Sequence, residues 1–366
     1  MTQIKRTQIK RTAEISVIFL TSLMACCCAW AADEAPRDVK FDGFVDGYYA
    51  YDFNGPPNFD RAFTTQPARS DEFNINLAYI GATLTEKKVR ARFALQAGTS
   101  VQNNYAGEPT NGAVSGPTLA RSIQEAYVGY RITDDLWLDG GIYFSHVGAE
   151  GFVSRDNLTY TRSLVADFSP YYQSGLRLSY KASDALQIQL HVINGWQVIS
   201  ENNHSKTLGT QVTYAISSRL NFSYNTLIGR ESEFRHFHDL ILKYEPSDEW
   251  SCVFQYDVGF QKQFGGSGFD SWSGFTLMAK YKLTSSKALS VRVEQYQDPH
   301  QVIVSTSTPN GFQVRSASLG YDVLLSQTVS WRTEFRNYWS MDSVYPSRDG
   351  ASSVDGLGVT SISASF

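Results

Sequence analysis

The chain has 366 residues, of which 14% are aromatic and only 19% are charged, and its mean hydropathy is −0.28. These values exclude a membrane protein built from apolar helices, and they suit strands that have one apolar and one polar face. The net charge of −4 argues against nucleic acid as a partner. No break in composition marks a domain boundary within the chain.

Residues 1–31 are predicted to be a secretory signal peptide. Basic residues precede an apolar run over residues 15–31, which ends in small residues suited to cleavage between Ala31 and Ala32. An uncleaved anchor and a lipoprotein with a modified Cys26 are the alternatives. Cleavage removes four basic residues and one acidic residue, so the charge of residues 32–366 becomes −4 − (4 − 1) = −7. It also leaves Cys252 without a second cysteine for a disulfide.

Residues 32–366 are predicted to form one domain in which apolar and polar residues alternate in about 16 short runs. The runs lie at 41–53, 73–85, 89–97, 126–132, 136–144, 171–180, 186–192, 208–214, 220–228, up to 244, 250–260, 275–281, 289–293, 319–323, 329–335 and 358–366. Short turns alternate with longer loops between them. Because every backbone group in a bilayer must be paired, such strands must close on themselves. We therefore expect a transmembrane antiparallel β-barrel with short periplasmic turns and long extracellular loops.

The third long connection, residues 145–170, is too long for a simple hairpin loop. Connections of this length are uncommon in compact domains and usually have a function. In wide barrels one long loop can fold inward, and we predict that this loop narrows the pore. Its charged residues are the candidates for the constriction: Glu150, Arg155, Asp156, Arg162 and Asp167.

Charged residues also lie on the polar faces of the predicted strands, which would line the lumen. They are Arg90, Arg92, Arg177, Arg292, Glu294, Arg332, Glu334 and Arg336. Set against the acidic residues of the long loop, these arginines would create a transverse field that favours polar solutes. The alternative is that they are solvated or paired with one another and have no selective role.

Tryptophans and histidines allow other interpretations. Most tryptophans fall near strand ends, so we expect interfacial girdles rather than sugar stacking: Trp137, Trp196, Trp250, Trp272, Trp331 and Trp339. His236 and His238 share a strand face, but no further ligand with metal-site spacing accompanies them. His146 and His191 are candidate bases for a hydrolase, although no G-x-S-x-G motif is present.

Several segments together resemble the OmpL-like putative β-barrel porin family. They are residues 43–49 (GFVDGYY), 124–128 (QEAYV), 141–144 (GIYF), 160–163 (YTRS) and 175–180 (GLRLSY). The resemblance implies an outer-membrane pore without catalytic residues to carry over.

We therefore expect a porin that lets small hydrophilic solutes diffuse across the bacterial outer membrane. It would need no cofactor or metal, would contact outer-membrane lipids, and could assemble as a homotrimer through its first and last strands. The alternative is a non-conducting barrel that acts as a surface receptor, an adhesin or a hydrolase.

Overall fold

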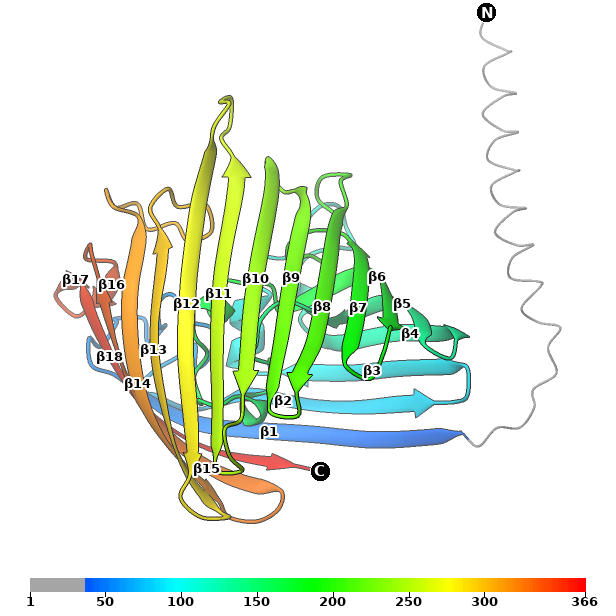
Figure 1. The fold of residues 1–366 in the computed structure, drawn as a ribbon. Helices are drawn as coiled ribbons and strands as arrows, with labels where there is room; N and C mark the ends of the chain where they lie inside the picture. Colours follow the sequence, from blue (N-terminus) through cyan, green and yellow to red (C-terminus); the bar gives the residue numbers. More distant parts are fainter. Residues whose placement is uncertain (1–36) are drawn as a thin grey trace, which may run out of the picture. The chain divides into compact units, whose positions relative to one another are not determined.

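The computed structural model describes residues 37–366, and within them sixteen antiparallel strands form one closed barrel (Figure 1). The barrel strands are β1 (Asp38–Asp52), β2 (Glu72–Thr85), β3 (Val89–Ala97), β4 (Ile123–Thr133), β5 (Leu136–Phe144), β6 (Tyr172–Lys181), β7 (Leu186–Ile193), β8 (Thr207–Ser217), β9 (Leu220–Arg230), β10 (Phe234–Tyr244), β11 (Trp250–Lys262), β12 (Phe269–Lys282), β13 (Lys287–Asp298), β14 (Phe312–Leu324), β15 (Val329–Ser340) and β18 (Val354–Ser365). The predicted fold class and strand count are confirmed. The predicted signal peptide and its cleavage site lie outside the described residues.

Neighbours in the sequence are neighbours in the barrel, and the first and last strands close it. Tyr48 of β1 lies opposite Ser361 of β18 in this closing pair. The strands drawn at the front, β8 to β12, cross β1 to β3 behind them at a steep angle (Figure 1). This crossing is what strand tilt produces on the two walls of a closed barrel.

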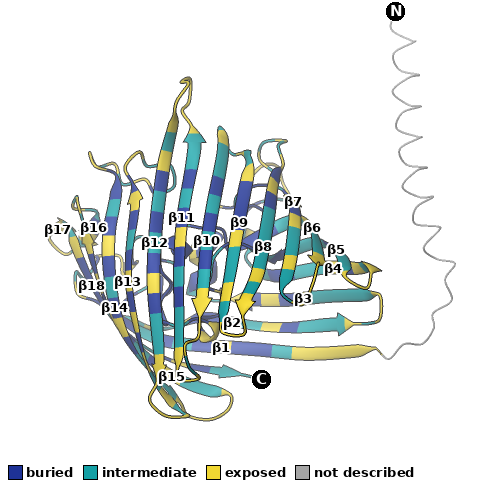
Figure 2. Cartoon of the chain, in the orientation of Figure 1, coloured by how far each residue is buried: buried dark blue, intermediate teal, exposed yellow. Residues whose placement is uncertain are grey.

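The outer face of the barrel is apolar and exposed. Outward side chains on separate strands, such as Val128, Leu190 and Phe335, are 62%, 51% and 58% exposed, and exposed positions alternate with buried ones along many strands (Figure 2). An apolar surface of this extent needs lipid to cover it. Exposed aromatic residues near the short turns form a girdle typical of a membrane interface: Tyr130, Tyr180, Tyr214, Tyr244, Trp250 and Trp331.

The connections differ between the two rims of the barrel. One rim, the turn rim, carries short turns such as residues 134–135 and 218–219, whereas the other, the loop rim, carries the connection 145–171 and other long loops. The connection 231–233 on the loop rim is an exception, because Phe234 pairs with Arg230 across the hairpin. His236 lies in β10, on a strand as predicted.

The remaining elements are short and belong to loops on the loop rim. They are α2 (Thr99–Asn104), α3 (Pro117–Ala120), the 3-10 turn η1 (Ser154–Asp156), α4 (Leu164–Asp167) and the small hairpin β16 (Tyr345–Ser347) and β17 (Gly350–Ser352). Within residues 37–366, none of these helices is long and apolar enough to cross a membrane.

The interior of the barrel is not uniformly polar. A cluster of buried apolar residues, here called the interior cluster, joins inward side chains of the wall to residues of the loops: Tyr143, Val147, Leu164, Val165, Ile193, Leu227, Phe237, Trp272, Tyr296, Val304, Phe312, Val314, Tyr338 and Tyr345. The loops therefore pack as a hydrophobic layer inside the barrel, which the sequence analysis did not foresee.

Two tryptophans belong to this layer and not to the girdles. Trp272 is only 2% exposed, and Trp196 packs against it with ring centroids 6.0 Å apart. The prediction of an interfacial position is wrong for both. Trp272 lies on the face of β12 opposite the exposed Leu277, and Trp196 lies on a connection that packs against the interior cluster.

Candidate functional site

The connection 145–171 folds into the barrel, as predicted, and buried side chains of the far wall bind its backbone. The amide of Gly148 donates to the Asp239 carboxylate of β10 at 2.7 Å, and the amide of Ala149 donates to Gln255 of β11 at 2.9 Å. Both acceptors are fully buried. The loop thus leaves β5 and crosses the lumen within its first few residues.

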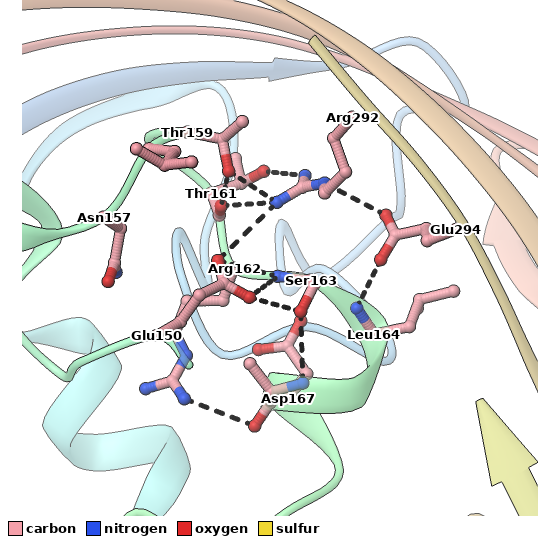
Figure 3. A network of polar contacts seen from close by, with 12 residues as sticks. Glu150, Asn157, Thr159, Thr161, Arg162, Ser163, Leu164, Asp167, Arg292 and Glu294 are labelled. Atoms are coloured by element: carbon pink, nitrogen blue, oxygen red, sulfur yellow. Dashed lines mark hydrogen bonds and ion pairs between the residues drawn. The ribbon is translucent and has the colours of Figure 1, made fainter. Parts of the chain in front are cut away.

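Further along, Thr161 of the loop meets Arg292 of the wall (Figure 3). It also contacts an acidic residue of the wall. Glu334 of β15 accepts hydrogen bonds from the Thr161 amide at 2.7 Å and from its hydroxyl at 2.9 Å. Arg292 of β13 donates to the Thr161 carbonyl at 2.7 Å and to the Thr159 hydroxyl at 2.8 Å. Arg292 and Glu334 also pair with each other at 3.0 Å, and both side chains are fully buried.

A second wall pair holds the start of α4. Glu294 of β13 accepts from the amide of Leu164 at 2.6 Å and pairs with Arg336 of β15 at 2.6 Å. Arg336 in turn donates to the carbonyl of Arg162 at 2.6 Å. The first turn of α4 is capped by Ser163, whose hydroxyl accepts from the amide of Ala166. The wall carboxylate thus satisfies an amide at the helix start that has no partner within the helix.

Arg332 of β15 holds the preceding part of the loop. It donates to the carbonyl oxygens of Ser154 at 2.5 Å and Leu158 at 3.1 Å, while its Nε pairs with Asp322 at 2.9 Å. We call the five wall residues that fix the loop in this way the loop anchor: Arg292, Glu294, Arg332, Glu334 and Arg336. All five had been predicted to be lumen residues, and the structure brings all five into contact with the loop.

Most of the predicted charged residues of the loop are buried. Glu150 accepts from the amide of Ser163 at 3.0 Å and lies 3.9 Å from Arg292, while Asp167 accepts from the hydroxyl of Thr65 at 2.5 Å. Burial raises the pKa of both carboxyls, against the opposing effect of nearby arginines.

Arg162 is also buried and lies over the ring of Tyr171 at 3.4 Å. Arg155 and Asp156, in contrast, are 44% and 57% exposed and pair with each other at 3.2 Å. Of the five loop residues, these two are therefore the ones that face solvent.

The other three predicted arginines lie on a different part of the wall, Arg90 and Arg92 on β3 and Arg177 on β6. Arg90 of β3 and Arg177 of β6 both pair with Asp139 of β5, at 2.6 and 2.9 Å. Arg92 pairs with Glu125 and Asp42. We call Arg90, Arg92 and Arg177 the arginine row. Their side chains are 30%, 15% and 18% exposed, whereas Arg292 and Arg336 are not exposed at all.

The histidines form two separate contacts. His146 of the loop stacks on His191 of β7 with ring centroids 4.0 Å apart, and its two ring nitrogens face Gln173 at 2.9 Å and the carbonyl of Thr226 at 3.1 Å. His191 lies near Tyr143 and Gln189. These contacts involve neither a serine nor a carboxylate of the kind that a hydrolase triad uses.

His236 and His238 lie 3.2 Å apart on β10, where His238 contacts the hydroxyl of Tyr224. Within residues 37–366, no three histidine, cysteine or acidic residues are grouped as a metal site requires.

Comparison with protein families identifies a match over residues 38–366 to the family described as Putative beta-barrel porin-2, OmpL-like. The chain belongs to this family. The resemblance noted in the sequence is confirmed, and the porin family together with the apolar outer face assigns the chain to the bacterial outer membrane as a porin. A search of the curated proteins finds no match.

Solved structures share the fold at low sequence identity. The outer membrane channel DcaP of Acinetobacter baumannii is 13% identical over 92% of this chain and 99% of that chain, with a TM-score of 0.60. The anion-selective porin from Comamonas acidovorans is 12% identical over 90% and 100%, with a TM-score of 0.56. A trimer form of OmpT from Vibrio cholerae is 7% identical over 90% and 99%, with a TM-score of 0.58.

Two carboxylates of the site, Asp139 and Asp46, were not predicted from the sequence. Asp139 lies on the inward face of β5 directly opposite Arg177 in the ladder, so the alternation of β5 could have revealed it. Asp46 of β1 accepts from the hydroxyls of Ser154 and Tyr160 in the loop, at 2.7 and 3.2 Å. No local signal in the sequence indicates that this carboxylate meets a loop more than one hundred residues away.

Proposed function

We propose that the protein is a diffusion porin in which small hydrophilic solutes pass through the barrel beside the anchored loop 145–171. The observation that carries this proposal is the loop anchor, since its buried ion pairs hold the loop across the lumen against β13 and β15. A loop fixed in this way narrows the lumen to a passage of constant size, which a freely moving loop would not do.

The partly exposed arginine row supports a passage along the wall from β3 to β6. Arg90, Arg92 and Arg177 remain accessible to water although each has a carboxylate partner. Gln187 and Asn221, on the same half of the barrel, are also exposed. In the proposed mechanism, charged and polar side chains on this wall order water and orient dipolar solutes, while Arg155 and Asp156 contribute from the loop.

The test is single-channel conductance of the purified protein, from Ala32 on, in a planar bilayer under a salt gradient. We expect discrete open steps of uniform size. Replacing Arg90, Arg92 and Arg177 with glutamine should shift the reversal potential toward cation preference, because Asp139, Glu125 and Asp42 lose their partners. Arg230→Gln, at an exposed position near the loop rim, is the matched control.

An unchanged reversal potential in the triple variant would refute the role of the arginine row. A barrel that inserts but never conducts would refute the porin proposal itself and would favour a receptor, adhesin or hydrolase. Sites on the loops would then be the place to look for function.

The same proposal includes the orientation and processing of the chain. A cleaved signal peptide of residues 1–31 would deliver the barrel with its turn rim in the periplasm and its loop rim outside. The N-terminal residue of the protein isolated from outer membranes should then be Ala32. Residue 1 at the N-terminus, or a lipid on Cys26, would overturn this part of the proposal.

We further infer a homotrimer that packs through the outer faces of β1, β2, β15 and β18. A shallow groove of about 550 Å³ on this surface is lined by Tyr49, Phe73, Trp331 and Ile362 among others. Light scattering in detergent should give three chains per particle, and Trp331→Arg should lower that number. A monomer in the wild-type protein would contradict this inference.

A further inference from the structure

A cavity of about 340 Å³ lies at the turn rim, between the turns 283–286 and 325–328 and the adjoining walls of β11 to β15 and β18. It is separate from the arginine row, which lies on β3 and β6 and contributes no residue to its lining. Its volume is in the range of about 300–1,000 Å³ that is usual for sites that bind small molecules. The loop contributes one side chain, Arg155, to its lining.

The lining of this cavity is strongly basic. Five of its residues carry a positive charge, and Asp322 is the one acidic residue among them, which gives 5 − 1 = +4. The basic residues are Arg155, Lys280, Lys282, Lys287 and Arg332. Even when Asp156, which pairs with Arg155 but does not line the cavity, is included, the charge is +3. A concave surface with this excess raises the local concentration of anions.

Asp322 cannot neutralise the cavity because two cations already share it. Lys280 lies 2.5 Å from one carboxylate oxygen, and Arg332 lies 2.9 Å from the other. Lys282 donates to the carbonyl of Asp248 at 2.8 Å, and the carboxylate near it, Glu249, does not line the cavity. Arg332 is also held by loop carbonyls, so the cavity has a rigid floor.

Hydroxyl groups provide further donors around these cations. Ser251, Thr284, Ser286, Ser330 and others line the same cavity. Lysine, arginine and hydroxyl donors in one concave site match the oxygens of phosphate and carboxylate groups. The cavity is too small for a macromolecule, and its charge disfavours cations.

We propose that this cavity binds small oxyanions with two negative charges, such as phosphate or a short dicarboxylate. The inference rests on the proposed function in one respect, since a solute that crosses the barrel would meet this site where the passage opens into the periplasm. The protein would then not only conduct but also hold divalent anions at one end of the passage.

The test is isothermal titration of the mature protein in detergent with inorganic phosphate, malonate or acetate at fixed ionic strength. The wild-type protein should bind phosphate and malonate more tightly than acetate. Lys280→Gln with Lys282→Gln should weaken phosphate and malonate binding by about 10-fold or more, since hydrogen bonds from charged donors are lost. Asp322→Asn should strengthen binding, because it removes the one negative charge of the lining.

The matched control is Lys87→Gln with Lys181→Gln, which removes two charges from exposed positions on the same rim that do not line the cavity. We expect this control to bind as the wild type does. Equal weakening in both lysine pairs would show only a diffuse charge effect and would overturn the proposal, as would a wild-type protein that binds none of the three anions.

The outcome does not depend on conduction. A barrel that stays silent in bilayers yet binds phosphate through Lys280 and Lys282 would refute the porin proposal and leave this site intact. If the barrel conducts but phosphate binds equally well to the wild type and to the variant without Lys280 and Lys282, the binding site is refuted and the porin proposal stands. Preference for phosphate over malonate, or the reverse, identifies which oxyanion the cavity fits.

Discussion

Glu294 is the residue whose loss should most directly release the loop. It is the one carboxylate within ion-pair distance of Arg336 in the described part of the chain, and it also accepts from the amide of Leu164. In Glu294→Gln the Arg336 guanidinium stays buried without a carboxylate at ion-pair distance. Removing one partner of a buried pair costs about 3–5 kcal/mol. The hydrogen bonds between strands keep the barrel wall folded, so we expect this loss of free energy to appear as weaker docking of the loop.

A loss of 3 kcal/mol corresponds to a change of about 150-fold in an equilibrium constant. The undocked fraction of the loop should therefore rise by at least that factor. Two measurements report it: the frequency of current fluctuations in single open channels, and the rate at which trypsin cleaves after Arg162, which is only 3% exposed in the docked loop. Glu245→Gln, in an exposed turn, is the control.

The double variant Glu294→Gln with Arg336→Gln distinguishes the cost of an unpaired buried charge from the cost of altered side-chain packing. It removes the uncompensated guanidinium, so the loop should be cleaved more slowly than in Glu294→Gln alone. If Glu294→Gln shows the same fluctuations and the same cleavage as the wild type, the anchor does not hold the loop and the reasoning is refuted.

Three further predictions concern the packing of the loop. Burial lowers the pKa of His146, so as the pH falls below 6.5 the wild-type loop should lose docking relative to His146→Phe, measured by channel fluctuations. Gly274→Ala should weaken docking by about 1–3 kcal/mol, measured by trypsin cleavage, because the new Cβ would lie 2.8 Å from Val165 of α4. Trp272→Ala should lower the free energy of unfolding by about 3–5 kcal/mol and lower the temperature at which the barrel unfolds in heat-modifiability gels, whereas Trp250→Ala on the outer face should not.

The sign of the pH effect follows from the direction of the pKa shift. The docked loop holds His146 neutral, so the undocked loop binds more protons below the ordinary histidine pKa, and acid favours undocking. Glu150 acts in the opposite direction, since burial raises its pKa and docking favours its protonated form. Identical pH profiles for His146→Phe and the wild type would exclude His146 as the sensor. For Gly274→Ala, Gly107→Ala is the control, because its Cβ meets no atom within 4 Å.

The alternation of side chains predicted the strands because in every strand of a membrane barrel one face contacts lipid and the other faces the interior. Leu136 and Leu138 must face lipid, and Asp139 must not, so each strand reveals its own orientation. The same rule placed Arg292 and Glu334 on the inner face. It could not reveal that they bind Thr161, since that contact depends on how a loop folds across the lumen and not on any period in the sequence.

Apolar residues on the inner face were harder to interpret for a related reason. Phe237 and Trp272 follow the inward alternation, but a pore was expected to be lined by polar groups, so Trp272 was assigned to a girdle. Once the loops are inside, both rings pack against Trp196 of the connection 194–206 and belong to the interior cluster. The alternation showed on which face of their strands Phe237 and Trp272 lie, but it did not show which residues they pack against.

The loop anchor also constrains how the barrel can be assembled. The loop is made early, between β5 and β6, but the residues that hold it lie on β13 and β15, near the end of the chain. A half-built sheet that lacks these strands offers Thr161 and Leu164 no carboxylate to bind. The contacts of Thr161 and Leu164 can therefore form only after β13 and β15 are in place, although Asp239 of β10 and Gln255 of β11 can bind the loop earlier. Complete docking of the loop thus requires a complete wall.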